Sequence, residues 1–183
     1  MGEIELIDGK ELERVIKRIA YEILEKSEDP KNITIVGIQE GGRIPAQRIA
    51  DLLSEELGEK IPIGFIDITF YRDDLYRRKD VPKPKETFLP FSIDGKEVFV
   101  VDDVIETGRT VRAAIDALLD YGRPKRIKLA VVVDKGHREL PIHPDITGRV
   151  IEAPPGKEII VLFNEKDGRD LVVMRDKNAS PGS

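Results

Sequence analysis

Residues 98–110 combine two acids with a turn suited to binding an anion. The apolar run at residues 98–101 is typical of a buried strand, and Asp102 and Asp103 follow it directly. In an open α/β fold, the carboxyl end of such a strand lies where ligands bind. The run Glu106-Thr107-Gly108-Arg109-Thr110 predicts a tight turn that opens a helix with free backbone N–H groups. We therefore predict a phosphate site beside two carboxylates.

Two adjacent aspartates repel a phosphate unless hydroxyl donors or a divalent cation such as Mg²⁺ lie between the charges. A phosphorylated ribose with Mg²⁺ meets this requirement, and Asp102 and Asp103 are the predicted metal ligands. The chain has no G-x-x-x-x-G-K-[ST] motif, which disfavours nucleoside triphosphate hydrolysis. A simpler interpretation is that Thr107 or Asp103 only caps the next helix. A cap needs one acceptor, however, whereas residues 102–106 include three acids.

The same run resembles the signature with which type I phosphoribosyltransferases bind phosphoribosyl diphosphate (PRPP). Further runs resemble the PyrR family, whose members are bacterial pyrimidine operon attenuators that also act as uracil phosphoribosyltransferases. These runs lie at residues 67–75, 110–118, 121–124 and 136–142. The His-Arg-Glu-Leu-Pro-Ile sequence in the last of them is far more specific to the family than the PRPP signature. The resemblance extends from about Leu12 to Leu171 in matching order.

This resemblance implies a fold, a ligand set and site residues. The implied fold is that of type I phosphoribosyltransferases, with a central, mostly parallel twisted sheet, helices on both faces and a flexible flap. The implied PRPP contacts are Asp102, Asp103, Val104, Ile105, Glu106, Thr107, Gly108, Arg109 and Thr110. The implied catalytic residues are Asp103, Glu106 and Arg138. Mg²⁺ is the implied cofactor, and PRPP, uracil, UMP and UTP are the implied ligands.

A second loop, Gln39-Glu40-Gly41-Gly42-Arg43, follows a predicted strand and precedes a predicted helix. Paired glycines permit backbone conformations closed to other residues and can expose N–H groups to an anion. Taken alone, the loop could be a simple strand-to-helix turn, but the resemblance makes it the pyrophosphate loop. PyrR proteins usually carry Thr-Arg-Gly where this chain has Glu40-Gly41-Gly42, so an arginine is missing and Glu40 brings the opposite charge. Either Arg43 substitutes for that arginine or the activity is reduced.

Glu106 is a second departure from the PyrR pattern, which usually has tyrosine there, whereas purine phosphoribosyltransferases place an acid near the base. Two interpretations stay open: a general base, or a charge stabilised by the helix N-terminus. The resemblance places Asp134, Lys135, His137 and Arg138 beside the base and PRPP. Alternatively, Arg138 and Glu139 form a structural ion pair, and His137 is an ordinary loop residue.

Alternating apolar runs predict a single α/β domain over residues 1–177. We expect strands at residues 32–38, 61–69, 98–101 and 127–133, helices at about 8–24, 46–57 and 111–121, and two more apolar runs within 151–174. This alternation argues for a parallel sheet with helices on both faces. Prolines and charges interrupt it over residues 70–94, the predicted flap, which carries Tyr71, Arg72 and Asp73. Residues 178–183 are predicted to be a disordered tail.

Composition excludes several other classes of protein. The 183 residues are 40% hydrophobic and 36% charged, as expected of a globular protein with one core. No apolar run approaches a membrane span and the N-terminus carries no export signal, so a cytoplasmic location is expected. The absence of cysteine excludes disulfides and thiolate chemistry, and two histidines are too few for a histidine-rich metal site. The family resemblance implies a homo-oligomer.

A net charge of −5 argues against nonspecific coating of nucleic acid, although a local basic patch remains compatible with it. Lys17, Arg18 and Arg149 correspond to the basic RNA surface of the resembling family, whereas Tyr21 replaces a histidine of related regulators. The alternative for the helical residues is an ordinary solvated face. Three functions stay open. They are a uracil phosphoribosyltransferase that also attenuates pyrimidine-leader mRNA, an RNA-binding regulator with little catalysis, and a purine phosphoribosyltransferase.

Overall fold

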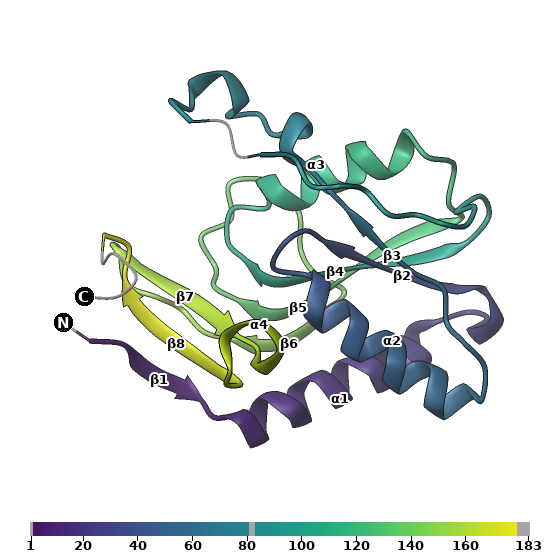
Figure 1. Ribbon diagram of the computed structural model, residues 1–183, viewed down its shortest axis with the longest axis horizontal. Helices are drawn as coiled ribbons and strands as arrows, with labels where there is room; N and C mark the ends of the chain where they lie inside the picture. Colours follow the sequence, from purple (N-terminus) through teal and green to yellow (C-terminus); the bar gives the residue numbers. More distant parts are fainter. Residues whose placement is uncertain (1, 81–82, 179–183) are drawn as a thin grey trace.

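The computed structural model describes residues 2–80 and 83–178, which form two sheets with helices packed around them (Figure 1). A parallel sheet has the strand order β3-β2-β4-β5-β6, and a smaller antiparallel sheet has the order β1-β8-β7. The larger sheet consists of β2 (Ile33–Ile38), β3 (Ile63–Ile66), β4 (Glu97–Ile105), β5 (Arg126–Asp134) and β6 (Ile146–Val150). The smaller sheet consists of β1 (Ile4–Ile7), β7 (Lys157–Leu162) and β8 (Leu171–Asp176). The helices are α1 (Gly9–Lys26), α2 (Arg43–Leu57), α3 (Arg109–Leu119) and α4 (Asn164–Asp167).

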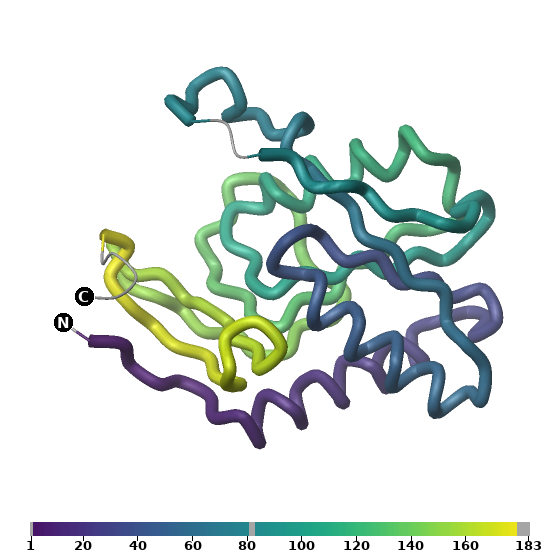
Figure 2. The backbone as a smooth tube through the Cα atoms, in the orientation of Figure 1, coloured from purple at the N-terminus to yellow at the C-terminus, as the bar shows by residue number. Residues whose placement is uncertain are grey.

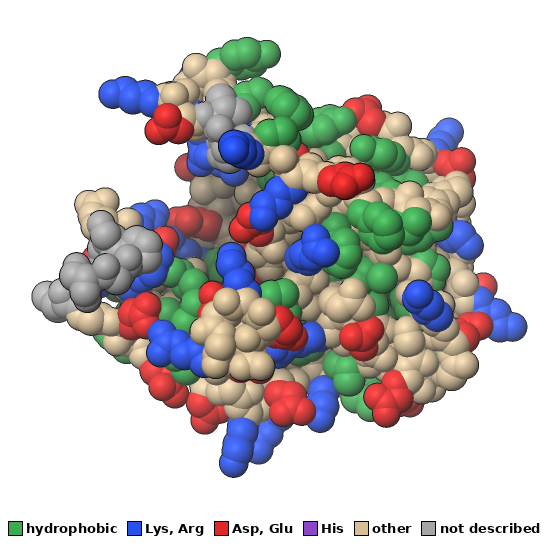
Figure 3. Space-filling model, in the orientation of Figure 1, with side chains coloured by type: hydrophobic (Ala, Val, Ile, Leu, Met, Phe, Trp, Pro, Cys, Tyr) green, Lys and Arg blue, Asp and Glu red, His purple; other side chains and the backbone are tan. Residues whose placement is uncertain are grey.

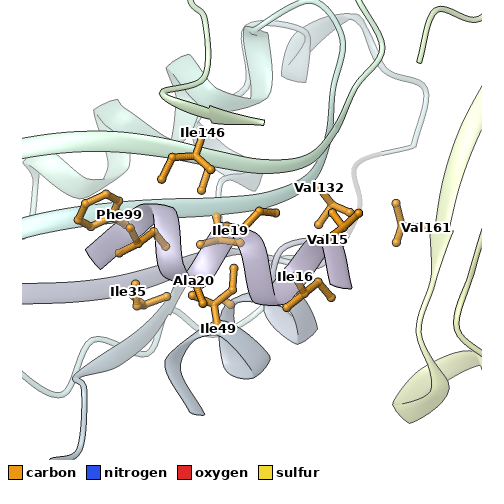
Figure 4. Packing of buried hydrophobic residues seen from close by; sticks show 14 of the residues in the cluster. Val15, Ile16, Ile19, Ala20, Ile35, Ile49, Phe99, Val132, Ile146 and Val161 are labelled. Atoms are coloured by element: carbon orange, nitrogen blue, oxygen red, sulfur yellow. The ribbon is translucent and has the colours of Figure 1, made fainter. Parts of the chain in front are cut away.

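Helix α1 forms where the sequence pattern predicts it. The Asp8 side chain accepts the N–H of Glu11 at 2.8 Å, which caps the first turn. The apolar residues then recur at helical spacing, and Figure 4 shows Val15, Ile16 and Ile19 in the packed interior with residues of the large sheet. Helix α1 therefore buries one face of the large sheet.

The predicted parallel sheet with helices on both faces is confirmed. Helices α1 and α2 pack with Phe99 and the other β4 and β5 side chains on one face of the sheet. Helix α3 packs with Val98, Val100 and their neighbours on the opposite face. Strand β4 is buried from both sides, which explains why residues 98–101 are apolar without alternation.

Strand β4 is longer than the predicted strand at residues 98–101. Its pairing with β5 continues past the apolar run, with Val104 beside Val133 and Ile105 beside Asp134. Asp102 and Asp103 therefore lie within the strand and not after its end, which fixes their backbones in the sheet. Two other boundaries also differ from prediction, because α2 begins at Arg43 and β3 covers only Ile63–Ile66.

The small antiparallel sheet was only partly predicted. Strands β7 and β8 account for the two apolar runs of residues 151–174, but β1 and β6 were not predicted. Strand β1 has four residues and pairs with β8 from the opposite end of the chain, with Ile4 beside Met174. A short strand paired over that separation leaves no periodic signal in its own sequence.

In the predicted flap, residues 70–94, the part up to residue 80 extends away from the sheets at the upper left of Figure 2, whereas residues 83–94 run back beside the large sheet. One short 3₁₀ turn, Thr69–Tyr71, lies where the flap begins, and another, Leu75–Arg77, lies within it. Phe88 then pairs with Phe65 of β3. Residues 81–82 and residues 179–183 of the predicted tail lie outside the described residues, and Asn178 lies in a turn. The flexibility of the flap stays a prediction.

None of the helices within residues 2–80 and 83–178 has the length and apolar character needed to cross a bilayer.

Candidate functional site

Two adjoining cavities surround the carboxyl end of β4. One, of about 360 Å³, is lined by Asp102, Asp103, loop residues 39–41 and part of the predicted flap. The other, of about 290 Å³, is lined by Glu106, Lys135 and residues of the small sheet. Asp102, Val104 and Thr110 contribute to both walls, so the cavities meet at the two predicted phosphate-site elements, β4 and α3. Figure 3 shows a hollow on this face between the flap and the small sheet.

Asp102 and Asp103 are held by their own backbone. The Asp103 N–H donates to Asp102 Oδ1 at 2.9 Å, and the Val104 N–H donates to Asp103 Oδ1 at 2.7 Å. Burial, with the neighbouring charge of Asp103, raises the pKa of Asp102 well above its ordinary value. Burial also raises the pKa of Asp103, although hydrogen bonds to that carboxylate oppose the shift. The strand thus holds two costly charges next to each other, which favours a ligand that supplies donors or a cation.

The predicted phosphate turn opens α3. Gly108 is the N-cap with φ +91°, a conformation that favours glycine. The Arg109 N–H donates to Thr107 Oγ1 at 3.2 Å, so part of the predicted capping role of Thr107 is present. The N–H groups of Thr110 and Val111 have no hydrogen-bond acceptor in the described part of the chain. These two donors at a helix N-terminus suit a phosphate.

The predicted pyrophosphate loop lies directly against β4. A Cβ at Gly41 would collide with the Asp103 carboxylate, and one at Gly42 would collide with the carbonyl of Val101. Neither glycine has a positive φ. Glycine is therefore required at both positions by this close approach and not by an unusual backbone conformation. The Gln39–Glu40 peptide bond is cis. Within residues 2–80 and 83–178, the backbone N–H groups of Glu40 and Gly41 have no hydrogen-bond acceptor.

Arg43 does not line the cavity that contains Asp103. Its side chain lies over the ring of Phe65, with 4.6 Å between the guanidinium carbon and the ring centroid. The structure therefore does not place Arg43 where the missing loop arginine would act. Because α2 begins at Arg43, the side chain leaves the loop as part of the helix surface.

The second cavity contains an ion pair between Glu106 and the buried Lys135. Lys135 Nζ lies 2.8 Å from Glu106 Oε1, and Lys177 Nζ lies 3.5 Å from the same oxygen. Burial opposes ionisation of Glu106 and is the largest single influence, but the hydrogen bonds and charges of Lys135 and Lys177 together outweigh it and lower the pKa of Glu106. A general base works best with a pKa near the working pH, so this shift favours a charge-positioning role over a general base.

The loop that follows β5 is fastened to the phosphate turn by Arg138. Arg138 Nη1 donates to the Glu106 carbonyl at 2.8 Å, and Nη2 donates to Asp134 Oδ2 at 2.7 Å. Arg138 therefore pairs with Asp134. The alternative interpretation, in which Arg138 pairs with Glu139, is wrong. His137 Nε2 lies 3.1 Å from the Ala153 carbonyl oxygen, and His137 lines neither of the two cavities. Of the predicted base-side residues, only Lys135 lines a cavity.

The predicted flap residues contact α3 and its N-terminal turn. The Tyr71 hydroxyl donates to Asp120, and this hydrogen bond raises the pKa of Tyr71 to about 12. Arg72 lines the cavity that contains Asp103. Arg109 pairs with Asp73 and, on its other side, with Glu139 at 2.8 Å. The phosphate turn is thus connected both to the flap and to the loop of Arg138.

Of the predicted RNA residues, Arg18 and Arg149 come together where α1 crosses β6, whereas Lys17 lies on the side of α1 that faces α2, beside Leu52. Arg18 donates to the carbonyl of Gly148, the residue before Arg149. Each of the three basic side chains pairs with a glutamate of α1, at N–O distances between 2.5 and 3.0 Å. Arg18 and Arg149 are therefore neighbours at this crossing, and their positive charge is largely balanced by glutamates.

Asp102 and Asp103 fit a magnesium ion that arrives with its substrate. Proteins usually hold Mg²⁺ by one or two carboxylates, with substrate oxygens and waters completing the shell. Two buried carboxylates that repel each other supply that minimum. The described residues contain no group of three or more histidine, aspartate or glutamate side chains that could hold a metal without a substrate.

Several cavity residues were not predicted from the sequence. Lys83, Lys85, Asp67 and Thr69 line the first cavity, and Glu158, Ile159 and Lys177 line the second. They come from the flap and the small sheet, whose placement depends on contacts between distant parts of the chain. The Asp67–Thr69 segment did carry a signal, since it belongs to one of the runs that resemble the family.

Comparison with known proteins identifies relatives of the whole chain. The model of the phosphoribosyl transferase domain matches residues 4–166. "Bifunctional protein PyrR" of Microcystis aeruginosa is 47% identical, over 92% of this chain and 95% of its own. The protein of the same name from Thermus aquaticus is 44% identical, over 96% of this chain and 97% of its own.

Solved structures show the same fold at lower identity. The hypoxanthine phosphoribosyltransferase of Trypanosoma cruzi has a TM-score of 0.68 at 19% identity, over 94% of this chain and 97% of that one. A hypoxanthine-guanine phosphoribosyltransferase of Bacillus anthracis has a TM-score of 0.66 at 21% identity, over 95% of this chain and all of that one. The predicted type I phosphoribosyltransferase fold is confirmed.

We expect Asp102→Asn to stabilise the ligand-free protein at pH 7.5 by about 1 kcal/mol or more. A carboxyl group whose pKa is raised on folding destabilises the folded state above that raised pKa, and the cost disappears as the pH falls towards the ordinary value. Asparagine removes the charge and keeps the Oδ1 acceptor of the Asp103 N–H. Urea unfolding measures the difference, which should shrink as the pH is lowered.

The exposed Asp51→Asn is the control for this prediction and should change the free energy of unfolding by less than about 0.5 kcal/mol. An Asp102→Asn protein no more stable than the wild type at pH 7.5 would contradict the raised pKa.

Proposed function

The chain belongs to the PyrR family of phosphoribosyltransferases, and we propose that it transfers the phosphoribosyl group of PRPP to uracil, giving UMP and pyrophosphate. One observation carries the proposal. Asp102 lies between a cavity bounded by the glycine loop, which Asp103 also lines, and a cavity bounded by Glu106, with the α3 N-terminus at the shared wall. PRPP and a base need this order of sites: diphosphate, ribose with its 5′-phosphate, and base.

Positioning and charge would carry most of the catalysis. The free N–H groups of Thr110 and Val111, with the Thr107 hydroxyl, would hold the 5′-phosphate. Asp102 and Asp103 would accept hydrogen bonds from the ribose hydroxyls. When bound between these carboxylates and the substrate, Mg²⁺ would supply positive charge that stabilises the departing pyrophosphate.

The flap would keep water from the sugar carbon while the bond to pyrophosphate breaks. An oxocarbenium-like sugar centre reacts with water as readily as with a base, so the site must be covered. Arg72, Lys83 and Lys85 already line the cavity from the flap side. The ion pair between Arg109 and Asp73 connects the start of the flap to the phosphate turn.

A purine base is the second candidate, and Glu106 is the observation that favours it. A carboxylate paired with the buried Lys135 presents both an acceptor and a donor to a base in the second cavity. Against it stands the His-Arg-Glu-Leu-Pro-Ile run at residues 137–142, which is typical of PyrR proteins. The names of the curated relatives also favour the pyrimidine.

The deciding experiment is a pyrophosphate-release assay with PRPP and Mg²⁺, run in parallel with uracil, hypoxanthine, guanine and xanthine. We expect release with uracil and none above background with the purines. Turnover of a purine but not of uracil would replace the first candidate by the second. Release with no base at all would indicate hydrolysis of PRPP, so a reaction without base is the control.

Asp103→Asn should slow this reaction by roughly ten- to a hundredfold or more, because a charge-assisted hydrogen bond at the site is worth about 1.5 to 3 kcal/mol. Steady-state kinetics with PRPP and uracil measure the effect, and Asp51→Asn serves as the matched control. Unchanged kinetics in Asp103→Asn would remove that residue from the proposed mechanism.

We also propose that the protein attenuates pyrimidine-leader mRNA in response to UMP or UTP, through Lys17, Arg18 and Arg149. The word "bifunctional" in the relatives' names and the approach of Arg18 to Gly148, the residue before Arg149, support this. Gel shifts with a pyrimidine-leader hairpin should show binding that tightens with UMP and weakens with salt. Equal affinity for an unrelated hairpin of the same length would contradict it. Arg149→Gln should weaken this binding, and Lys60→Gln, which removes an exposed lysine elsewhere on the surface, is its control.

A further inference from the structure

Glu40, the acid of the predicted pyrophosphate loop, is paired with two lysines from different parts of the chain. Lys85 approaches it from the flap, and Lys166 Nζ of α4 lies 3.5 Å from Glu40 Oε2. The three side chains are about half exposed, at 51% for Glu40, 48% for Lys85 and 64% for Lys166. Exposed ion pairs of this kind contribute little to stability, about 0 to 1 kcal/mol, so folding alone does not account for the arrangement.

Lys85 is held at the loop by the backbone around it. Gln39 Nε2 donates to the Glu86 carbonyl at 2.5 Å, and the Asp67 N–H donates to Thr87 Oγ1 at 3.1 Å. The chain on the C-terminal side of Lys85 is thus tied to the pyrophosphate loop and to the end of β3. The side chain of Lys85 also lines the cavity that contains Asp103.

Lys166 is held on the other side through α2. Arg48 of α2 donates to Glu165 Oε1 at 2.8 Å and to Asp170 Oδ2 at 3.0 Å. Its guanidinium carbon also lies 5.1 Å from the centre of the Phe163 ring. These contacts fasten α4, which carries Lys166, to the helix that begins directly after the loop. The positive charge of Lys166 acts on Asp103 and opposes the rise in the pKa of that carboxyl group.

The loop itself offers no cationic side chain to the cavity. The position where PyrR proteins usually have arginine is Gly41, and Arg43 lies over Phe65. The N–H groups of Glu40 and Gly41, which have no acceptor in the described part of the chain, face a cavity bordered by Asp102 and Asp103. A diphosphate placed there needs positive charge. Arg72, Lys83 and Lys85 line the cavity, and Lys85 also pairs with Glu40 of the loop, as does Lys166, which lies outside the lining.

We propose that Lys85 and Lys166 bind the diphosphate group of the substrate in place of the missing loop arginine, and that Glu40 occupies both lysines until the diphosphate arrives. The inference rests on the proposed function and deepens it. A diphosphate carries more negative charge than one carboxylate and offers several oxygens, so it displaces Glu40 from both ammonium groups. The bound diphosphate then connects the flap to α4 across the pyrophosphate loop.

Isothermal titration calorimetry with sodium pyrophosphate, with and without Mg²⁺, tests this directly. Lys85→Gln and Lys166→Gln should each weaken pyrophosphate binding by about tenfold or more. Glu40→Gln should tighten it several-fold, because a competing charge is removed. Ribose 5-phosphate, which lacks the diphosphate, should bind all three variants and the wild type equally, and its binding also shows that each variant is folded. Lys60→Gln is the matched control for loss of one exposed lysine.

Equal pyrophosphate affinity in Lys85→Gln, Lys166→Gln and Lys60→Gln would overturn the inference while leaving the proposed transfer reaction intact. Weaker binding in Glu40→Gln would overturn the part given to Glu40. The converse failure is also distinguishable. If the wild type transfers phosphoribosyl to no base, yet the two lysine variants lose pyrophosphate binding, the proposed function fails and the diphosphate site stands.

Discussion

Two neighbouring carboxylates in a buried strand are the constraint on which the rest of this structure depends. Placing Asp102 and Asp103 next to each other in β4 costs free energy in the absence of a ligand, since burial opposes the charge of both and the charge of Asp103 further opposes that of Asp102. The burial of apolar residues on both faces of the same strand offsets that free-energy cost. The site is thus strained electrostatically and supported mechanically, as preorganised ligand sites require.

Every element near these carboxylates limits what can enter the site. The glycine loop approaches so closely that Gly41 has no room for a side chain beside Asp103. The turn before α3 presents N–H donors on the other side, and the Lys135–Glu106 pair closes the far cavity. A ligand that fits must carry anionic groups at two points and hydroxyl groups between them. Membership of the PyrR family is consistent with such a ligand.

The local parts of this arrangement could be predicted from the sequence, and the long-range parts could not. The strand before Asp102, the glycine turn at Gly108 and the capped start of α1 are set by neighbours in the chain, so their patterns are visible directly. The pairing of Glu40 with Lys85 and Lys166 joins segments that only the tertiary fold brings together. The direction of Arg43 likewise depends on where α2 begins, and helix boundaries are the least certain part of a pattern.

The small sheet joins the two ends of the chain, because β1 pairs with β8, and its strand β7 supplies Glu158 and Ile159 to the second cavity. Lys177, just after β8, lies in the same wall. The parallel sheet and its carboxylates, in contrast, are complete in sequence by Val150. During synthesis the strand that carries both carboxylates and the turn that opens α3 therefore leave the ribosome first. The wall of the second cavity is completed only when Lys177, after the last strand, has been made.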